Sequence, residues 1–297
     1  MPASDIARRL AAPALRLPLR DLAGAWRQAT VSARVLGHAA LAHDLDLLRR
    51  IRGAIGNVLL EGASPDAIAG RSCPWRPPCA LDILFNEQGR RGAHGIPKPY
   101  ALAAERKSQD LLVSVTLFGA AAGWAGVMAH ALATALQHRI DWRASKPGLF
   151  FPAALVGHVA VDVVEVRPAS PRTAADIEFV TPMNAEGDDP VERPATIFAR
   201  LARRVEGLAL WQDVAIAEDW VRLGEAWNSV AYDTSLLRRS RAARHSGRGH
   251  RSFVAETIEG TLRMDDLPDA LWPLLVIGQL THVGKGATAG FGRFRVV

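Results

Sequence analysis

The chain has 297 residues, enough for one large domain or two ordinary ones with a buried core. Hydrophobic residues make up 49% and charged residues 22%, a globular composition that excludes an intrinsically disordered chain. The net charge is +6, and only four of the 36 basic residues are Lys. This excess of Arg fits a GC-rich genome, and it also suits bidentate contacts with phosphate.

Neither the cysteines nor the apolar segments point to a metal, a disulfide or a membrane. Cys73 and Cys79 have no companion pair, so we expect free thiols rather than a zinc site. We identify no apolar run of the ~20 residues that a membrane helix requires. Arg8, Arg9 and Arg16 interrupt any signal-peptide pattern. The sequence therefore predicts a cytoplasmic protein without metal, cofactor or membrane attachment.

The N-terminal third mixes short strands with helices. Alternating leucines predict a strand over residues 14–20, and a helix is expected over residues 22–42. Asp44 is placed to cap a second helix, where apolar residues recur at helical spacing over residues 45–59. Residues 63–99 are rich in Gly and Pro, which indicates loop with one short strand or helical turn.

The rest of the chain alternates strands and helices. Strands are predicted over residues 111–118, 152–166, 176–181, 252–264 and the last few residues, and helices over 123–138, 194–232 and onward from Pro273. This βαββαβ-like order is typical of ferredoxin-like domains. We therefore predict an α+β fold of two tandem ferredoxin-like (RRM-like) domains, residues 1–105 and 106–297. The second would carry a helical, Arg-rich insertion at about residues 194–251.

Two Arg clusters are candidates for nucleic-acid binding. Residues 237–251 contain six Arg and two His, and no acid occurs between Asp233 and Glu256. A basic run without counter-ions favours a nucleic-acid arm over an ordinary solvated face. Its arginines are Arg238, Arg239, Arg241, Arg244, Arg248 and Arg251. The second cluster, Arg49, Arg50 and Arg52 on the predicted second helix, is either an RNA contact or a solvated helix face.

Residues 284–292, called here the glycine loop, follow an apolar helix and precede the last strand. Four of these nine residues are glycines, Gly284, Gly286, Gly290 and Gly292, with Lys285 inside the loop and Arg293 after it. Glycines allow positive φ and bring backbone N–H groups close to a ligand, so this loop suits phosphate oxygens. The order helix, loop, strand does not match a dinucleotide fingerprint, which favours a nucleic-acid backbone.

The glycine loop also resembles that of a known superfamily. Gly284-x-Gly286 followed by Gly290-Phe291-Gly292 is similar to the C-terminal loop of the RAMP superfamily of CRISPR proteins. It resembles most the endoribonuclease that cuts precursor CRISPR RNA within its repeats. Further segments resemble that family in its own order: residues 52–56, 73–79, 84–85, 96–100, 179–182, 198, 201–204 and 274–297. The resemblance covers about residues 50–297.

The resemblance implies two ferredoxin-like domains, metal-independent cleavage beside the stem-loop of the repeat, and retention of the 3′ hairpin of the mature CRISPR RNA. It also implies other effector-complex subunits as partners. The segment 194–251 suggests the type IV variant. Two alternatives stay open. One is a non-catalytic RNA-binding subunit of the superfamily, and the other is an unrelated Arg-rich nucleic-acid-binding protein.

Cleavage without metal uses the 2′-OH of the RNA as nucleophile and leaves a 2′,3′-cyclic phosphate. The protein must remove the 2′-OH proton and stabilise the charge on the phosphorane, and His suits the proton step. The resemblance favours His38 and His43, because the family's active-site His commonly lies near the first helix. Apart from the resemblance, the alternative active-site residue is His245 or His250 in the Arg-rich segment, and His94 is a weaker candidate. A third possibility is that arginines alone position the phosphate.

Overall fold

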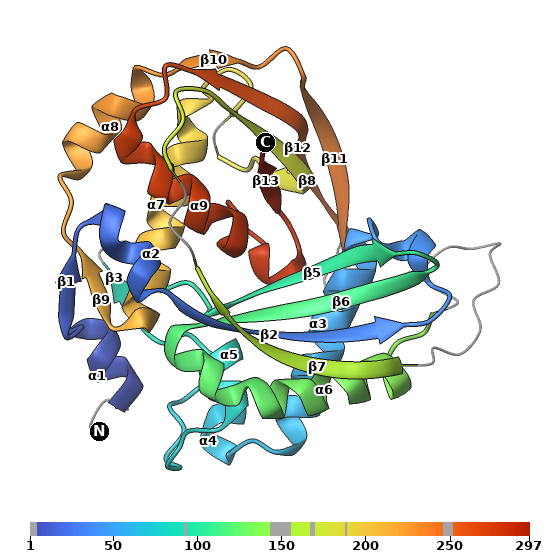
Figure 1. Ribbon diagram of the computed structural model, residues 1–297. Helices are drawn as coiled ribbons and strands as arrows, with labels where there is room; N and C mark the ends of the chain where they lie inside the picture. Colours follow the sequence, from blue (N-terminus) through green and yellow to red (C-terminus); the bar gives the residue numbers. More distant parts are fainter. Residues whose placement is uncertain (1–4, 92–93, 143–155, 167–169, 188, 246–251) are drawn as a thin grey trace. The chain divides into compact units, whose positions relative to one another are not determined.

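The computed structural model describes residues 5–91, 94–142, 156–166, 170–187, 189–245 and 252–297 (Figure 1). The chain divides into two compact units. Unit 1 comprises Met1–Arg16, Trp26–Glu165 and Gly207–Ala215; unit 2 comprises Leu17–Ala25, Val166–Glu206 and Ile216–Val297. The boundary expected at residues 105/106 falls inside unit 1, within a strand. Each unit is described by itself below.

Unit 1 is built on a four-stranded antiparallel sheet. Its strands are β2 (Arg27–Val35), β5 (Tyr100–Lys107), β6 (Asp110–Phe118) and β7 (Val156–Glu165), in the order β5-β6-β2-β7. The helices α3 (Leu45–Glu61) and α6 (Ala125–His138) connect them and contact each other (Figure 1). The chain order is therefore β-α-β-β-α-β with the two outer connections made by helices. The ferredoxin-like prediction is confirmed for this unit.

Strand β2 replaces most of the helix predicted over residues 22–42, of which only α2 (Leu22–Ala25) is α-helical and Ala39–Leu41 forms a 3-10 helix. In β2, Ala29, Val31, Ala33 and Val35 are buried and alternate with less buried residues. Alanine favours a helix in isolation, but β2 hydrogen-bonds to β6 on one side and to β7 on the other. Pairing with two neighbours outweighs the intrinsic preference of this segment.

The two long helices of unit 1 were predicted correctly. Asp44 caps α3 by accepting a hydrogen bond from the Leu47 N–H at 3.0 Å. Residues Gly119–His138 have the length and apolar composition of a membrane-spanning helix, in contrast to the expectation that no run is long enough. In the structure, however, α6 lies against β2 and β7 and buries Met128, Leu132 and Leu136. It is thus a core helix of unit 1.

Short elements complete unit 1. They are α1 (Asp5–Ala11), β1 (Leu15–Leu17), α4 (Pro65–Ile68), α5 (Ala80–Phe85), β3 (Arg90–Arg91), β4 (His94–Gly95) and β9 (Val214–Ile216), where β1 and β9 run into unit 2 at their last residues. Cys73 and Cys79 are both free and buried. The Cys79 N–H donates to the Cys73 sulfur at 3.3 Å, so this pair closes the loop before α5 by packing.

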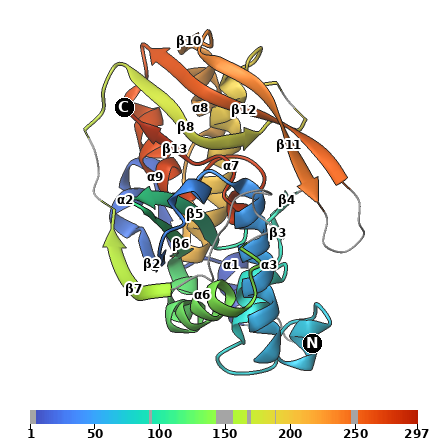
Figure 2. The same ribbon diagram turned by 90° about the vertical axis from the view of Figure 1, so that its right-hand side faces the viewer.

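Unit 2 repeats the same plan with a larger sheet (Figure 2). Its strands are β8 (Ala175–Asn184), β10 (Ala231–Asp233), β11 (Leu237–His245), β12 (Ser252–Asp265) and β13 (Phe294–Val296). Strand β12 pairs with β8 on one side and with β10 and β11 on the other, and β13 pairs with β8. The helices are α7 (Ala195–Ala209), α8 (Trp220–Asn228) and α9 (Trp272–Thr281). With α7 and α9 as the two connections, the core is again βαββαβ.

The structure changes the interpretation of residues 194–251. Helix α7 belongs to the ferredoxin-like core, α8 is the added helix, and the Arg-rich segment forms strand β11 of a hairpin with β12. The expected helical insertion is therefore helical only in part. Pro182, expected to end its strand, lies inside β8.

Candidate nucleic-acid interface

The glycine loop of unit 2 is closed at its base by backbone hydrogen bonds. The Val283 N–H donates to the Gly292 carbonyl at 2.8 Å, and the Gly292 N–H donates to the Pro182 carbonyl at 2.9 Å. The Thr181 hydroxyl donates to the Gly290 carbonyl at 2.7 Å and accepts from the Arg293 N–H at 3.0 Å. Strand β8 therefore holds both ends of the loop.

The glycines are required by this closed backbone. Gly292 has φ +66°, and a Cβ there would lie 1.9 Å from the Val283 carbonyl oxygen. Gly286 has φ +87°, and its Cβ would lie 3.0 Å from the ring of Phe291. Gly284 and Gly290 also have positive φ, 80° and 86°. A side chain at these positions would be strained or would clash.

The N–H groups of the second half of the loop do not point to a ligand. Those of Gly290 and Phe291 donate to the carbonyls of Ala287 and Gly286, while Gly292 and Arg293 use theirs on β8. The expectation that the glycines expose N–H groups to phosphate is thus not met at these four positions. The exposed cation of the loop is Lys285, whose Nζ lies 3.3 Å from a Glu186 carboxylate oxygen.

His282, which precedes the loop, was not recognised as important in the sequence. It is 3% exposed and has φ +61°. Burial, followed by the charges of Arg204 and Arg293, lowers the pKa of His282 to about 3. Burial also lowers the pKa of Arg204 to about 10, so Arg204 stays charged at neutral pH, and its Nε donates to the Thr281 carbonyl at 2.5 Å. His282 is therefore a neutral structural residue at the end of α9.

The arginines of β11 have different roles. Arg238, Arg239 and Arg241 are all exposed. The Nε of Arg239 donates to Asp189 at 2.8 Å, and its Nη2 donates to Glu192 at 2.9 Å, so its charge is balanced. These bonds raise the pKa of Arg239 and hold that of Asp189 below its usual range.

A cleft of about 680 Å³ lies beside this ion pair. Arg193 and Arg241 line it, and neither forms an ion pair within the described part of the chain. The cleft therefore offers two arginines without an ion pair, and Glu256, the cross-strand neighbour of Arg241, also lines it. Sequence reasoning missed Arg193, which lies outside both Arg clusters. The backbones of Arg244 and His245 belong to β11, but their side chains, like all of Arg248, His250 and Arg251, lie outside the described residues.

In unit 1, residues 36–44, called here the histidine loop, connect β2 to α3. The Gly37 N–H donates to Asp110 at 2.9 Å, and the Nε of Arg34 donates to the other oxygen of this carboxylate at 2.5 Å. These two bonds, the Gly37 N–H first, lower the pKa of Asp110. The carboxylate therefore anchors the start of the loop.

The two candidate histidines of this loop differ in accessibility. His38 is fully buried; its Nδ1 donates to the Leu36 carbonyl at 2.6 Å, and its ring lies edge-on to Trp142 with the centroids 4.7 Å apart. His43 is exposed and directly precedes the cap residue Asp44. Of these two, only His43 is accessible to a substrate. His94 is also exposed, on β4.

The arginines of α3 contact other parts of unit 1. Arg49 and Arg50 lie 3.7 Å and 3.6 Å from Asp46, and Arg50 also donates to the Asp141 carbonyl at 2.8 Å. The Nε of Arg52 donates to the Tyr100 hydroxyl at 3.0 Å, and its guanidinium lies 5.1 Å from the centroid of the Phe85 ring. These contacts are those of a helix face tied into its own domain.

Residues 177–294 match the sequence model of a family described as CRISPR-associated endoribonuclease Cas6. The match runs from β8 into β13, so it includes the glycine loop and the strand that holds it. The resemblance to the repeat-processing endoribonucleases is confirmed for residues 177–294. Among the curated proteins, none matches the chain.

Solved structures of Cas6 proteins share the fold. A product complex of Cas6 (TTHB231), a protein of Thermus thermophilus, superposes with a TM-score of 0.54 at 18% identity, covering 92% of this chain and 100% of that chain. A product complex of a second Cas6 (TTHA0078) has a TM-score of 0.50 at 17% identity, with 91% and 99% covered. The type IV Cas6 crRNA endonuclease Csf5 has a TM-score of 0.46 at 12% identity, with 91% and 99% covered. The first two confirm the predicted fold class.

Proposed function

We propose that this chain is a Cas6-type endoribonuclease that cleaves precursor CRISPR RNA within the repeat, beside its stem-loop. The observation that carries the proposal is the Cas6 match over residues 177–294, which includes the whole glycine loop. The ferredoxin-like unit 1, with the accessible His43 on a structured loop, supports it. The proposal includes retention of the 3′ hairpin as a subunit of an effector complex; the type IV assignment stays a prediction.

For catalysis we assign the general base to His43. An exposed imidazole can take the proton from the 2′-OH, whose oxygen then attacks the adjacent phosphate. The products are a 2′,3′-cyclic phosphate and a 5′-OH, and no metal takes part. The buried His38 and the anchor Asp110 fix the loop that carries His43. Such fixing keeps a catalytic group near its working position and lowers the entropic barrier.

For RNA binding we assign the uncompensated cations of unit 2. Arg193, Arg238 and Arg241 have no ion pair among the residues that the structure describes, so their charges are available to phosphates. Arg239 does not contribute a free charge, because it pairs with Asp189 and Glu192 and so helps to hold the β11–β12 hairpin in place. A stem of A-form RNA would be recognised by shape, phosphates and 2′-OH groups.

A non-catalytic RNA-binding subunit is the second candidate. One observation favours it: the His43 side chain has no hydrogen bond to any described residue, so nothing in unit 1 orients its ring. A general base is usually oriented by a neighbouring group. A non-catalytic subunit would keep the glycine loop and the cations but would not need His43.

The deciding experiment is cleavage of a labelled repeat hairpin in EDTA, beside a hairpin with a single 2′-deoxy at the mapped cut. Cleavage of the all-RNA hairpin alone would support the proposed 2′-OH mechanism. Tight binding without cleavage would establish the non-catalytic alternative. If neither occurs, both candidates are wrong. A deoxy hairpin that is still cut would show a different chemistry.

A further inference from the structure

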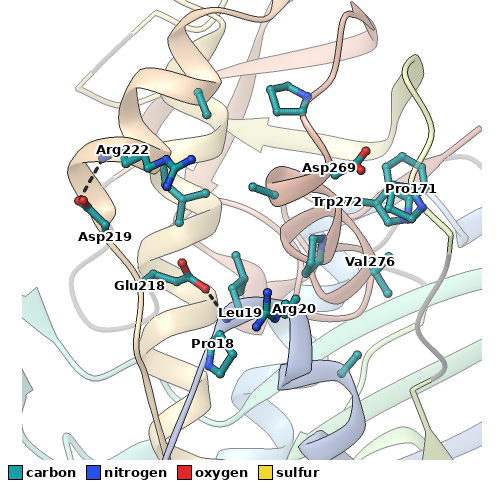
Figure 3. A pocket seen from close by; sticks show the side chains of 16 residues that line it. Pro18, Leu19, Arg20, Pro171, Glu218, Asp219, Arg222, Asp269, Trp272 and Val276 are labelled. Carbon is teal, nitrogen blue, oxygen red and sulfur yellow. Dashed lines mark hydrogen bonds between the residues drawn. The ribbon is translucent and has the colours of Figure 1, made fainter.

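A cavity of about 810 Å³ in unit 2 lies among the segment Pro18–Ala23, helix α8 and the start of α9 (Figure 3). Two carboxylates at its edge already serve the fold. Glu218 accepts from the Leu19 N–H at 2.6 Å, and Asp219 caps α8 by accepting from the Arg222 N–H at 3.1 Å. Figure 3 shows the bonds of both carboxylates. Two nucleophilic side chains that the proposed function does not use lie instead in unit 1.

These side chains are Cys73 and Cys79, the only two cysteines of the chain. Both are free, and their exposed fractions are 5% and 7%. The Cys79 N–H donates to the Cys73 sulfur at 3.3 Å, and the Cys79 thiol donates a second hydrogen bond to the same sulfur. The two thiols are therefore in direct contact, which a disulfide requires.

The loop between the two cysteines is held at both ends. The Cys73 N–H donates to the buried Asp82 carboxylate at 2.9 Å. The Trp124 Nε1–H donates to the carbonyl of Pro78, the residue before Cys79, at 3.0 Å. These two bonds keep the thiols within reach of each other, so a reaction between them needs no rearrangement of the fold.

The two thiols differ in acidity because their surroundings differ. Burial raises the pKa of Cys73, but hydrogen bonds from the Ser64 hydroxyl and from the N–H groups of Cys79 and Trp75 outweigh burial. The pKa of Cys73 therefore lies below its ordinary value. For Cys79, burial is the largest influence and raises the pKa. Cys73 is thus the better source of a thiolate nucleophile, and Cys79 holds its proton.

The surroundings of the pair select the size of a reagent. Residues 74–77, between the two cysteines, are exposed, while Cys73 itself keeps an exposed fraction of only 5%. Hydrogen peroxide is only slightly larger than water, so it needs little open surface. A bulky oxidant such as a protein disulfide would have to displace this loop. The geometry therefore favours a small hydroperoxide.

We propose that Cys73 and Cys79 form a peroxide-sensitive pair. Cys73 is the residue that reacts with hydrogen peroxide, and Cys79 is the residue that converts the product into a disulfide. A nucleophilic thiol beside a second, resolving cysteine is the usual arrangement of a redox-sensitive site. The inference goes beyond RNA processing and is independent of whether the chain cleaves RNA.

The reaction has two steps. The Cys73 thiolate attacks one oxygen of the peroxide, the O–O bond breaks, and Cys73 becomes a sulfenic acid. The departing hydroxide takes up the proton that Cys73 had released. The Cys79 sulfur then attacks the Cys73 sulfur, so that the S–S bond forms as the S–O bond breaks, and the oxygen leaves as water with the Cys79 proton. Two thiols are oxidised by two electrons, and the peroxide is reduced to two waters.

The test treats the reduced full-length protein with hydrogen peroxide and then blocks the remaining thiols with N-ethylmaleimide in denaturant. Because the chain has only these two cysteines, the number of maleimide adducts in the intact mass counts the thiols that remain. We expect a monomer without adducts, and a peptide map that places a disulfide between residues 73 and 79.

Two variants separate the roles of the cysteines. Cys79→Ser removes the resolving thiol, so a sulfenic acid should accumulate at Cys73 and be trapped by dimedone. Cys73→Ser is the matched control. Its remaining thiol, Cys79, should be oxidised about 10-fold more slowly than Cys73 is in the first variant.

A comparison without substitutions keeps the test decisive if a variant does not fold. At pH 6 an ordinary thiol, with a pKa of about 8.5, is almost wholly protonated. Folded wild type should therefore lose its thiols to peroxide about 3-fold or more faster than wild type unfolded in urea, where the hydrogen bonds to Cys73 are lost. An unfolded chain that reacts as fast as the folded one would contradict an activated Cys73.

Other outcomes would also overturn the proposal. Wild type that keeps both thiols in excess peroxide would do so, as would a protein that forms only disulfide-linked dimers on a non-reducing gel. Faster oxidation of Cys79 in Cys73→Ser than of Cys73 in Cys79→Ser would reverse the assigned roles and reject them. RNA does not enter these measurements, so their failure leaves the proposed function untouched.

Discussion

The histidine loop of unit 1 and the glycine loop of unit 2 are held in place by different interactions. Each contains a buried His, next to Gly37 of positive φ in one loop and itself of positive φ in the other, and each presents an exposed polar side chain, His43 or Lys285. The histidine loop depends on a carboxylate, Asp110, and on open space around Gly37. The glycine loop depends on backbone bonds and on glycines with no room for a Cβ.

The difference shows what burial does to a histidine. His38 and His282 are both buried, and each supports the backbone of its loop. His43 has no such structural role and is exposed. A buried imidazole has no route to a substrate proton, so exposure separates the proposed catalytic His43 from the two buried histidines. Substitutions in both loops test whether exposure distinguishes the histidines and how each loop is held in place.

The largest expected effect is on cleavage. His43→Ala should lower the single-turnover cleavage rate of a repeat hairpin about 10²-fold to 10⁴-fold, the usual contribution of a general base. Hairpin affinity and melting temperature should stay unchanged because His43 is exposed. His38→Ala is the matched control: it should lower the melting temperature. Full cleavage by His43→Ala would remove this residue from the mechanism.

The second prediction concerns the glycines. Gly292→Ala should reduce the free energy of unfolding by about 3 kcal/mol or more, since it combines positive φ with overpacking. Gly37→Ala meets nothing within 4 Å, so only its φ of +72° is penalised, by about 1 kcal/mol. Urea unfolding of both variants gives the comparison. Equal losses would mean that the contact between Gly292 and Val283 relaxes freely.

Much of the fold was accessible from sequence, since long alternating or helical segments define strands β6, β7 and β12 and helices α3 and α6. The domain boundary was not. Glu105, Arg106 and Lys107 look like a linker, yet they end β5 before a tight turn through Ser108, which has φ +57°. The pairing of β5–β6 with β2 is a long-range contact that no local pattern encodes.

The candidate site was accessible only in outline. Composition identified the Arg-rich segment, but whether an arginine is free depends on acids far along the chain. Arg239 is balanced by Asp189 and Glu192, roughly 50 residues earlier, which no spacing rule reveals. His38 packs against Trp142, about 100 residues further along the chain, whereas His43 is exposed. Tertiary contacts therefore decide the roles that residue type alone leaves open.

A third prediction uses the titration of His282. Its pKa of about 3 lies below the ordinary value of about 6.5, so between these values the unfolded chain binds a proton that the folded chain does not. Stability from this residue is complete above pH 6.5 and is lost as the pH falls. Between pH 6.5 and pH 5 the free energy of unfolding should drop by about 2 kcal/mol.

The matched variant is His282→Asn, since Asn does not titrate and, at φ +61° and ψ +168°, is a non-glycine residue in the same strained backbone conformation as His. Urea unfolding at several pH values should show a flatter profile for this variant over the same window. Because the histidine loop is held by a carboxylate whose pKa is lowered, its own weakening should begin only at more acidic pH. A wild-type profile that is already flat above pH 5 would contradict a buried, neutral His282.

The smallest expected effect distinguishes two neighbouring arginines of β11. Arg241 has no carboxylate partner in the described structure, so its charge can replace counterions on RNA, whereas the charge of Arg239 is balanced. Arg241→Ala should reduce the slope of log affinity against log salt for a repeat hairpin by about 1. Arg239→Ala should change that slope less and act mainly on the loop that carries Asp189. Equal slope changes in the two variants would mean that the ion pair of Arg239 opens when RNA binds. If neither variant changed the slope, β11 would not belong to the RNA interface.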